Sequence, residues 1–164
     1  GDELILHYQP KIDMASGRVM GLEALVRWQN PELGLVSPGE FIPLAEETGL
    51  IIPIGAWVLE AACTQAMNWR EEEFDPLTMA VNLSGLQFRR PGLSSQVRKV
   101  LMKTGLPPEY LELELTESIL MGDTKGTITA LHELKEMGLK LSVDDFGTGY
   151  SSLSYLKHFP LDYL

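Results

Sequence analysis

Hydrophobic positions along the chain follow two spacings, one typical of helices and one typical of strands. In the segment 54–70 apolar residues recur every three or four positions, which predicts an amphipathic helix. In the segment 110–116 apolar and polar residues alternate, which predicts a strand. Ser37 followed by Pro38 marks a helix start, because proline is favoured in the first helical turn.

The whole chain divides into segments of these kinds. We expect strands at 4–10, 19–28, 79–83, 110–116 and 139–143, with a further strand beginning at 161–164. We expect helices at 38–47, 54–70, 93–104, 124–137 and 154–158. The segments 30–38 and 144–152 are expected to be loops.

The alternation of strands and helices predicts an α/β fold with a mostly parallel sheet. Right-handed crossovers leave two main architectures, an open doubly wound sheet and a (β/α)8 barrel. An open sheet is expected to carry a glycine-rich phosphate-binding turn after its first strand. The segment 13–17 holds a single glycine, which favours the barrel.

Composition excludes several classes of protein. With 45% hydrophobic and 22% charged residues, the chain is typical of a globular protein rather than a disordered one. The most apolar stretch, 50–59, is interrupted by Pro53 and Gly55, so we expect no membrane span. Cys63 is the only cysteine, so no internal disulfide can form. A cytoplasmic location is expected, either alone or as the cytoplasmic part of a larger membrane or sensory protein.

The chain is strongly acidic, with 23 acidic and 13 basic side chains and a formal net charge of −10. Long nucleic acid binds largely through basic contacts to phosphate, so we do not expect it as a partner. Carboxylates that cluster can instead hold divalent cations, which then attract a small phosphorylated ligand. Solubility alone would also explain the charge.

Oxygen-bearing side chains lie at or near the ends of four predicted strands. They are Glu23, Asn82, Glu114, Glu117, Asp144 and Asp145. In parallel α/β folds the carboxyl ends of the strands meet at one rim, where sites form. Hard oxygen donors suit Mg²⁺ or Mn²⁺, and two such ions can activate water and polarise a phosphodiester.

Some of these residues also have a simpler interpretation. Glu112 and Glu114, in Leu-Glu-Leu-Glu-Leu, can form the solvent-exposed face of an edge strand. Glu23 can pair with Arg27 on the same strand face. Asn82 can cap the segment that follows it.

Asp144 and Asp145 favour a functional site, because they end a strand and precede Phe146-Gly147-Thr148-Gly149. Two glycines within three residues indicate a tight loop with unusual backbone angles.

Several short motifs follow one another along the chain. They are Tyr8-Gln9-Pro10, Glu23-Ala24-Leu25-Val26-Arg27-Trp28, Val81-Asn82-Leu83-Ser84, Glu114-Leu115-Thr116-Glu117 and Asp144-Asp145-Phe146-Gly147-Thr148-Gly149. In these motifs the sequence resembles the EAL domain family, the cyclic di-GMP phosphodiesterases named for the tripeptide at 23–25. The resemblance covers the whole chain.

The resemblance implies a TIM-like (β/α) barrel of EAL type with an antiparallel first strand, incomplete in this chain. Residues 1–164 then correspond to the N-terminal two-thirds of an EAL domain. The family hydrolyses one phosphodiester bond of cyclic di-GMP to linear pGpG, with two Mg²⁺ or Mn²⁺ ions as cofactors. The parent protein is expected to be a homodimer.

The resemblance also implies roles for single residues. The implied metal ligands are Glu23, Asn82, Glu114, Asp144 and Asp145. Catalytic roles are implied for Asp145, as a ligand or as the holder of the water on the metal, and for Glu117, which braces the loop 144–152. Gln9, Leu25 and Arg27 are implied to contact the dinucleotide, with Arg27 on a phosphate.

The family continues past these motifs with a Lys-Ile-Asp motif and a later glutamate, which orient or activate the attacking water. We therefore expect the 164-residue chain alone to have little or no hydrolase activity. A non-catalytic receptor for cyclic di-GMP is the alternative, although receptors usually show eroded signatures and these are intact. A third hypothesis is an interaction fragment that associates through an exposed sheet edge.

Overall fold

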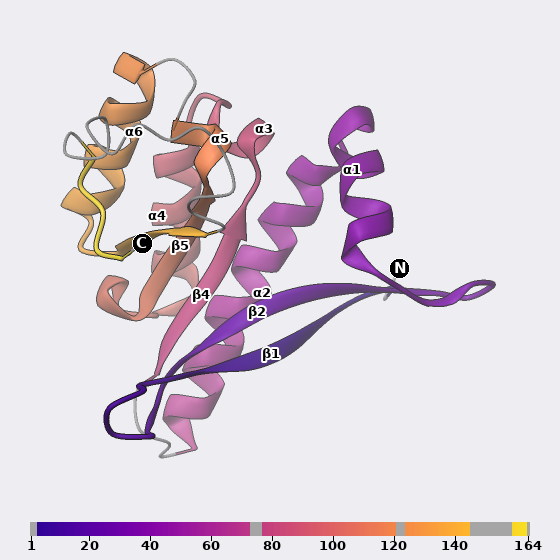
Figure 1. Ribbon diagram of the computed structural model, residues 1–164, viewed down its shortest axis with the longest axis horizontal. Coiled ribbons are helices and arrows are strands. Elements are labelled where there is room, and N and C mark those ends of the chain that lie inside the picture. The colour runs from indigo at the N-terminus through magenta and orange to yellow at the C-terminus, as the bar shows by residue number, and fades with distance from the viewer. Residues whose placement is uncertain (1–2, 73–76, 121–123, 145–158, 164) are drawn as a thin grey trace.

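The computed structural model describes residues 3–72, 77–120, 124–144 and 159–163 (Figure 1). Its strands are β1 (Leu4–Ile12), β2 (Val19–Asn30), β3 (Gly34–Val36), β4 (Thr78–Leu83), β5 (Leu111–Thr116) and β6 (Lys140–Asp144). Its α-helices are α1 (Pro38–Thr48), α2 (Ile51–Glu71), α3 (Gly85–Phe88), α4 (Leu93–Thr104), α5 (Glu117–Leu120) and α6 (Thr124–Glu136), and a 3-10 helix covers Pro108–Tyr110. The short helix expected at 154–158, and the loop expected at 144–152 beyond its first residue, lie outside the described residues.

The strands form one sheet in the order β1-β2-β4-β5-β6, with β3 paired to β2. β1 runs antiparallel to β2, while β2, β4, β5 and β6 run parallel to one another. A parallel bridge between Ser142 and Tyr163 lies where a further strand was expected to begin. The expected α/β fold, with a mostly parallel sheet and an antiparallel first strand, is therefore confirmed.

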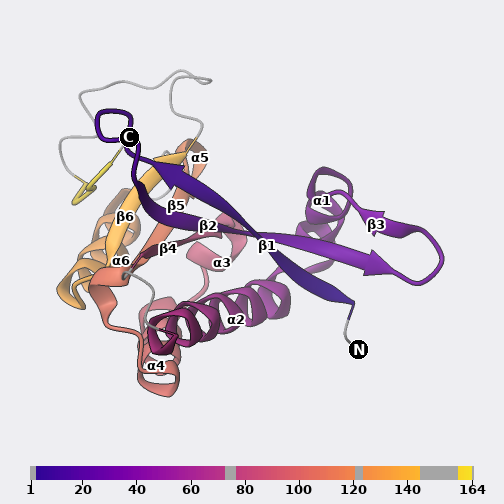
Figure 2. The same ribbon diagram turned by 90° about the horizontal axis from the view of Figure 1, so that it is seen from below.

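One face of the sheet packs against helices, and Figure 2 shows α2, α4 and α6 on that side of the strands. The residues of β5 that point to this side are Leu111, Leu113 and Leu115, each at most 1% exposed. They share the core with Val97 of α4 and Leu131 of α6. Because successive side chains of a strand point to opposite faces, the glutamates between these leucines point away from the core.

The segment 30–38, expected to be a loop, contains the short strand β3. Asn30 begins a tight turn, in which its Oδ1 accepts hydrogen bonds from the backbone N–H groups of Glu32 and Leu33, both at 2.9 Å. Gly34 follows with a φ of 75°, and the chain then returns antiparallel along β2. A strand of three residues is too short to show a period, so the hydrophobic pattern could not reveal it.

The main helices lie where the pattern predicted them, with shifted ends. α2 begins at Ile51 rather than at residue 54, because Pro53 lies in the first turn, where its missing N–H breaks no helical hydrogen bond. The helices α3 and α5, of four residues each, were not expected. Within the described ranges, no helix has both the length and the apolar character needed to cross a membrane.

A close contact between α2 and α3 fixes the turn that follows β4. Ser84 caps α3: its Oγ accepts a hydrogen bond of 3.2 Å from the Gln87 N–H, and Gln87 Oε1 accepts one of 3.3 Å from the Ser84 N–H. The Gln87 side chain is buried against Gly55 of α2, where an added Cβ would lie 1.9 Å from Gln87 Nε2. Glycine at position 55 thus lets the cap close just after Asn82, near the carboxyl end of β4.

Gly55→Ala is expected to lower the stability of the chain, because the new methyl group must displace Gln87 and open the cap at Ser84. Loss of such a cap costs about 1 kcal/mol, and the steric overlap adds to this. Thermal unfolding followed by circular dichroism measures the effect.

Gly39→Ala in α1 is the matched control, because the nearest heavy atom to its added Cβ lies 3.9 Å away. This variant is expected to be neutral or stabilised by up to about 1 kcal/mol, as alanine favours the helix over glycine. A melting temperature of Gly55→Ala equal to or above that of the unmodified chain would contradict the proposed contact.

Candidate active site

Three of the predicted metal ligands are neighbours on adjacent strands. Asn82 and Glu114 lie near the carboxyl ends of β4 and β5, and Glu23 lies beside Asn82 on β2. Asn82 Nδ2 donates a hydrogen bond of 2.6 Å to Glu23 Oε1. Asn82 and Glu114 are partners in the parallel ladder of β4 and β5, so their side chains share one face of the sheet. The negative charge of Glu23 also raises the pKa of Glu114, so the two carboxylates lie within electrostatic reach.

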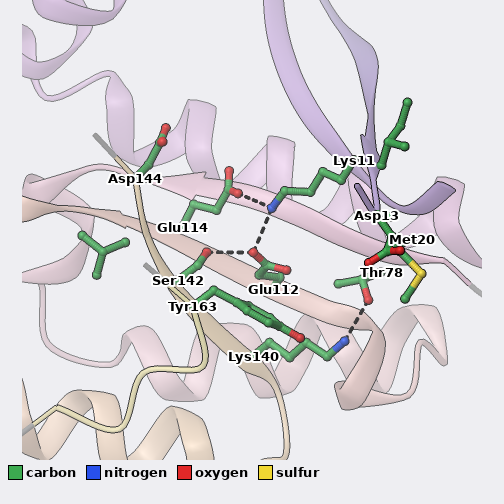
Figure 3. Close-up of a pocket in the computed structure, with 13 residues that line it drawn as sticks. Lys11, Asp13, Met20, Thr78, Glu112, Glu114, Lys140, Ser142, Asp144 and Tyr163 are labelled. Atoms are coloured by element: carbon green, nitrogen blue, oxygen red, sulfur yellow. Dashed lines mark hydrogen bonds and ion pairs between the residues drawn. The ribbon is translucent and has the colours of Figure 1, made fainter. Parts of the chain in front are cut away.

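Asp144 ends β6 at the same rim. It pairs with Thr116 of β5, and Ser142, two positions earlier on β6, pairs with Glu114. Asp144 and Glu114 therefore belong to one face, and both line an open pocket of about 570 Å³ (Figure 3). The strand ends thus bring the four described candidates to one side of the sheet.

Glu114 has a strongly raised pKa. Burial of its side chain, which is 7% exposed, is the main cause and raises the pKa to about 7, with Lys11 opposing and Glu23 and Glu112 adding to the rise. Glu114 Oε1 contacts Lys11 Nζ, whereas Glu114 Oε2 is buried and has no hydrogen-bond partner among the described residues. An oxygen of this kind is costly unless a donor or a cation reaches it.

Glu112 is a second buried carboxylate on the inner face of β5. Its Oε1 accepts hydrogen bonds from Lys11 Nζ and Ser142 Oγ, both at 2.8 Å (Figure 3). The interpretation of Glu112 and Glu114 as the exposed face of an edge strand is therefore wrong. β5 lies between β4 and β6, and both carboxylates are buried against Lys11.

The other two simple interpretations also fail. Ser84, rather than Asn82, caps the following helix, and the Asn82 side chain binds Glu23 instead. No ion pair between Glu23 and Arg27 is found in the part of the chain that the structure describes. The Arg27 guanidinium donates a hydrogen bond of 2.9 Å to the carbonyl oxygen of Val26.

The residues predicted to contact a nucleotide share the inner face of β1 and β2. Gln9 lies directly opposite Glu23 in the antiparallel ladder, so both side chains point to the same face. Leu25 and Arg27 follow Glu23 at steps of two along β2 and point to that face as well. Gln9, Leu25 and Arg27 therefore lie on the same face of the sheet as the predicted metal ligand Glu23.

The two residues with predicted catalytic roles differ in what the structure shows. Glu117 is a half-buried residue that opens α5 directly after β5, at the same end of the sheet as Glu114. Asp145, which is also a predicted metal ligand, lies outside the described residues.

The donor set at the rim fits a hard divalent cation. It consists of carboxylate and amide oxygens, and it includes the buried, unpartnered Oε2 of Glu114. In the described ranges, no three His, Cys, Asp or Glu side chains form a metal-binding group by themselves.

The pattern of the sequence did not reveal the roles of Lys11, Glu112 and Ser142. Lys11 continues the period-two alternation of Gln9 and so lies on the same face, but its partner Glu112 is 101 positions away. Such a contact has no local signature in the sequence, and it is recognised only once β5 is placed between β4 and β6.

Comparison with known proteins gives a consistent result. The EAL domain model matches residues 1–164. The chain is 50% identical over 158 residues to the bifunctional diguanylate cyclase/cyclic di-GMP phosphodiesterase MucR of Pseudomonas aeruginosa, which covers 96% of this chain and 23% of MucR. It is 47% identical over 163 residues to the cyclic di-GMP phosphodiesterase NbdA of the same organism, which covers 99% of this chain and 21% of NbdA.

A solved structure of the PaMucR phosphodiesterase in complex with c-di-GMP superposes on the chain with a TM-score of 0.93 at 49% identity. The match covers 98% of this chain and 65% of the solved one. The chain therefore spans less than a quarter of the two curated relatives and part of this solved chain. The superposition confirms the fold class expected from the motifs.

Without divalent cations, Glu114 is expected to make stability depend on pH. Its pKa is about 7 in the folded chain against an ordinary value of 4.5, so between these values the folded chain binds more protons than the unfolded one. Stability is therefore expected to fall as the pH rises through this window, by an amount of roughly 3 kcal/mol.

In Glu114→Gln the side chain cannot ionise, so the variant should not lose stability as the pH rises. In EDTA its melting temperature is expected to exceed that of the unmodified chain by more at about pH 8 than at about pH 5. Glu109→Gln, at an exposed position, serves as the control. An equal difference at both pH values would show that the Glu114 carboxylate is not desolvated.

Proposed function

Because the chain belongs to the EAL domain family, we propose that the protein carrying it hydrolyses cyclic di-GMP to linear pGpG with Mg²⁺ or Mn²⁺. MucR and NbdA, which are similar over nearly the whole chain, are cyclic di-GMP phosphodiesterases. The observation in this chain that carries the proposal is the juxtaposition of Glu23, Asn82 and Glu114, with one buried carboxylate oxygen of Glu114 left for a cation.

In this proposal Glu23, Asn82, Glu114 and Asp144 hold the cations, together with Asp145. When bound, the cations polarise the scissile phosphodiester and lower the pKa of the attacking water. The chain contributes fixed oxygen donors. The Asn82 hydrogen bond orients Glu23, and the ladder of β4 and β5 holds Asn82 beside Glu114.

The inner face of β1 and β2 is proposed to bind the dinucleotide. The Arg27 guanidinium can donate two parallel hydrogen bonds to a phosphate, which fixes the position of the phosphate. Gln9 offers amide donors and acceptors, and Leu25 offers apolar contact to a base. Glu117 is proposed to brace the loop 144–152. In a chain of net charge −10, these groups and the cations are needed to attract an anionic ligand.

A module that binds cyclic di-GMP without hydrolysing it is the second candidate. The solved PaMucR structure that superposes on this chain holds c-di-GMP, and such binding is common to a receptor and to an enzyme. For such a receptor, nucleotide binding would survive removal of all metal, and no pGpG would form.

We also propose that the protein acts in the cytoplasm and as a homodimer. The single cysteine is compatible with a reducing compartment, and the dimer is an implication of the family. Measurement of the molar mass in solution tests the homodimer, and it also tests the hypothesis of association through a sheet edge.

The protein incubated with cyclic di-GMP and Mn²⁺ is expected to form pGpG, measured by liquid chromatography. EDTA is expected to abolish the reaction, and Glu114→Gln to slow it by at least about 100-fold, because a ligand of the cation is lost. Glu109→Gln, exposed and remote from the rim, should react like the unmodified protein.

Two outcomes would contradict this proposal. Equal pGpG formation in EDTA would exclude the metal-dependent mechanism, and tight nucleotide binding without any pGpG would favour the receptor. The expectation that the 164 residues alone have little activity stays a prediction, and the same assay applied to the chain as printed tests it.

Arg27→Ala is expected to weaken binding of cyclic di-GMP by about 10- to 100-fold, because a charge-assisted hydrogen bond to phosphate contributes about 1.5–3 kcal/mol. Isothermal titration calorimetry measures the dissociation constant. Arg98→Ala, at an exposed position of α4, is the matched control. A dissociation constant unchanged in Arg27→Ala would place the phosphate elsewhere.

A further inference from the structure

Lys11 of β1 reaches across one face of the sheet to the interior strand β5. It lies near the end of β1, where the antiparallel ladder pairs it with Gly21 at the start of β2. β2 and β4 stand between β1 and β5 in the sheet, yet the Lys11 ammonium contacts Glu112 and Glu114 on β5 (Figure 3). The sheet therefore curves so that the end of β1 faces β5.

The Lys11 ammonium is held in place by Glu112. Glu112 Oε1 accepts one hydrogen bond from Lys11 Nζ and another from Ser142 Oγ of β6, both at 2.8 Å. Glu112 is 5% exposed, so its carboxylate is shielded from water, whereas the Lys11 side chain remains 37% exposed. Residues of β1, β5 and β6 thus together fix the position of the Lys11 ammonium.

From that position Lys11 also binds Glu114, at Oε1. The other oxygen, Glu114 Oε2, is buried and has no hydrogen-bond partner among the described residues. A carboxylate with one oxygen fixed in this way has its remaining oxygen in a defined place. Asn82 lies beside it in the β4–β5 ladder, and Glu23 is hydrogen-bonded to Asn82.

We propose that Lys11 is a positioning residue that binds Glu114 Oε1, so that Glu114 Oε2 becomes the oxygen offered to a divalent cation. The inference rests on the proposed function, because it takes Glu114 as a metal ligand. It adds a residue outside the oxygen donors and assigns separate tasks to the two oxygens of one carboxylate.

The alternative role for Lys11, competition with the cation, predicts the opposite change in metal affinity when Lys11 is removed. If Lys11 only competes with the cation for Glu114, or only repels it, its removal strengthens metal binding. If Lys11 positions Glu114, its removal weakens metal binding, as loss of an outer partner of a ligand typically does by about 10- to 100-fold.

Binding of Mn²⁺ alone to the full chain, followed by electron paramagnetic resonance of the free ion, separates these roles. Lys11→Met is expected to weaken binding by about 10- to 100-fold, and Lys11→Arg, which keeps a cationic donor, to restore most of it. Lys140→Met is the matched control: Lys140 lines the same pocket but donates to Thr78 Oγ1 at 3.0 Å, and its removal should leave the affinity unchanged.

The outcomes also separate this inference from the proposed function. Mn²⁺ binding that is lost in Glu114→Gln but unchanged or stronger in Lys11→Met overturns the role of Lys11 and leaves the metal site intact. Absence of Mn²⁺ binding in the unmodified chain, or binding unaffected by Glu114→Gln, overturns the metal role of Glu114 and with it both proposals.

Circular dichroism and thermal unfolding show whether each variant folds. If Lys11→Met does not fold, Glu112→Gln gives the decisive measurement, because it keeps the lysine and weakens its anchor. Positioning predicts a smaller loss of Mn²⁺ affinity in Glu112→Gln, of about 10-fold, and an unchanged affinity overturns the inference.

Discussion

The burial of two carboxylates on the interior strand β5 is the constraint on which the pocket side of this sheet depends. Glu112 and Glu114 are both buried, and an unpaired buried carboxylate is strongly destabilising. The Lys11 ammonium on β1 contacts both and offsets one of their two charges, and Ser142 Oγ on β6 donates a hydrogen bond to Glu112. The burial of β5 is thus linked electrostatically to two other strands, and one of them is the strand that runs against the parallel order.

The two faces of β5 have different tasks, one in the hydrophobic core and one in the pocket. Leu111, Leu113 and Leu115 hold β5 against the helical layer, and the alternate glutamates face the pocket. A change in register by one residue would place leucines in the pocket and carboxylates in the core, so the leucines also fix the direction of the glutamates. The geometry of the rim therefore depends on the hydrophobic core directly beneath it.

Much of this arrangement could be predicted from the sequence, and the failures have physical causes. The long helices and the interior strands carry strong periods, and the motifs around Glu23, Asn82 and Glu114 located the rim. β3 is too short to show a period. The pattern Leu-Glu-Leu-Glu-Leu is identical for an exposed edge strand and for a central strand with a charged inner face, so only the strand order could decide between them.

The contact between Gly55 and Gln87 has a consequence for how related sequences can diverge. With no room for a Cβ at position 55, a larger residue there requires a smaller or differently oriented residue at position 87, which then gives up the cap on Ser84. The two positions should vary together among relatives, although they lie on different helices and neither carries a donor of the rim. Coupled variation at such a pair would record a steric constraint inherited with the fold, separate from selection on the nucleotide site itself.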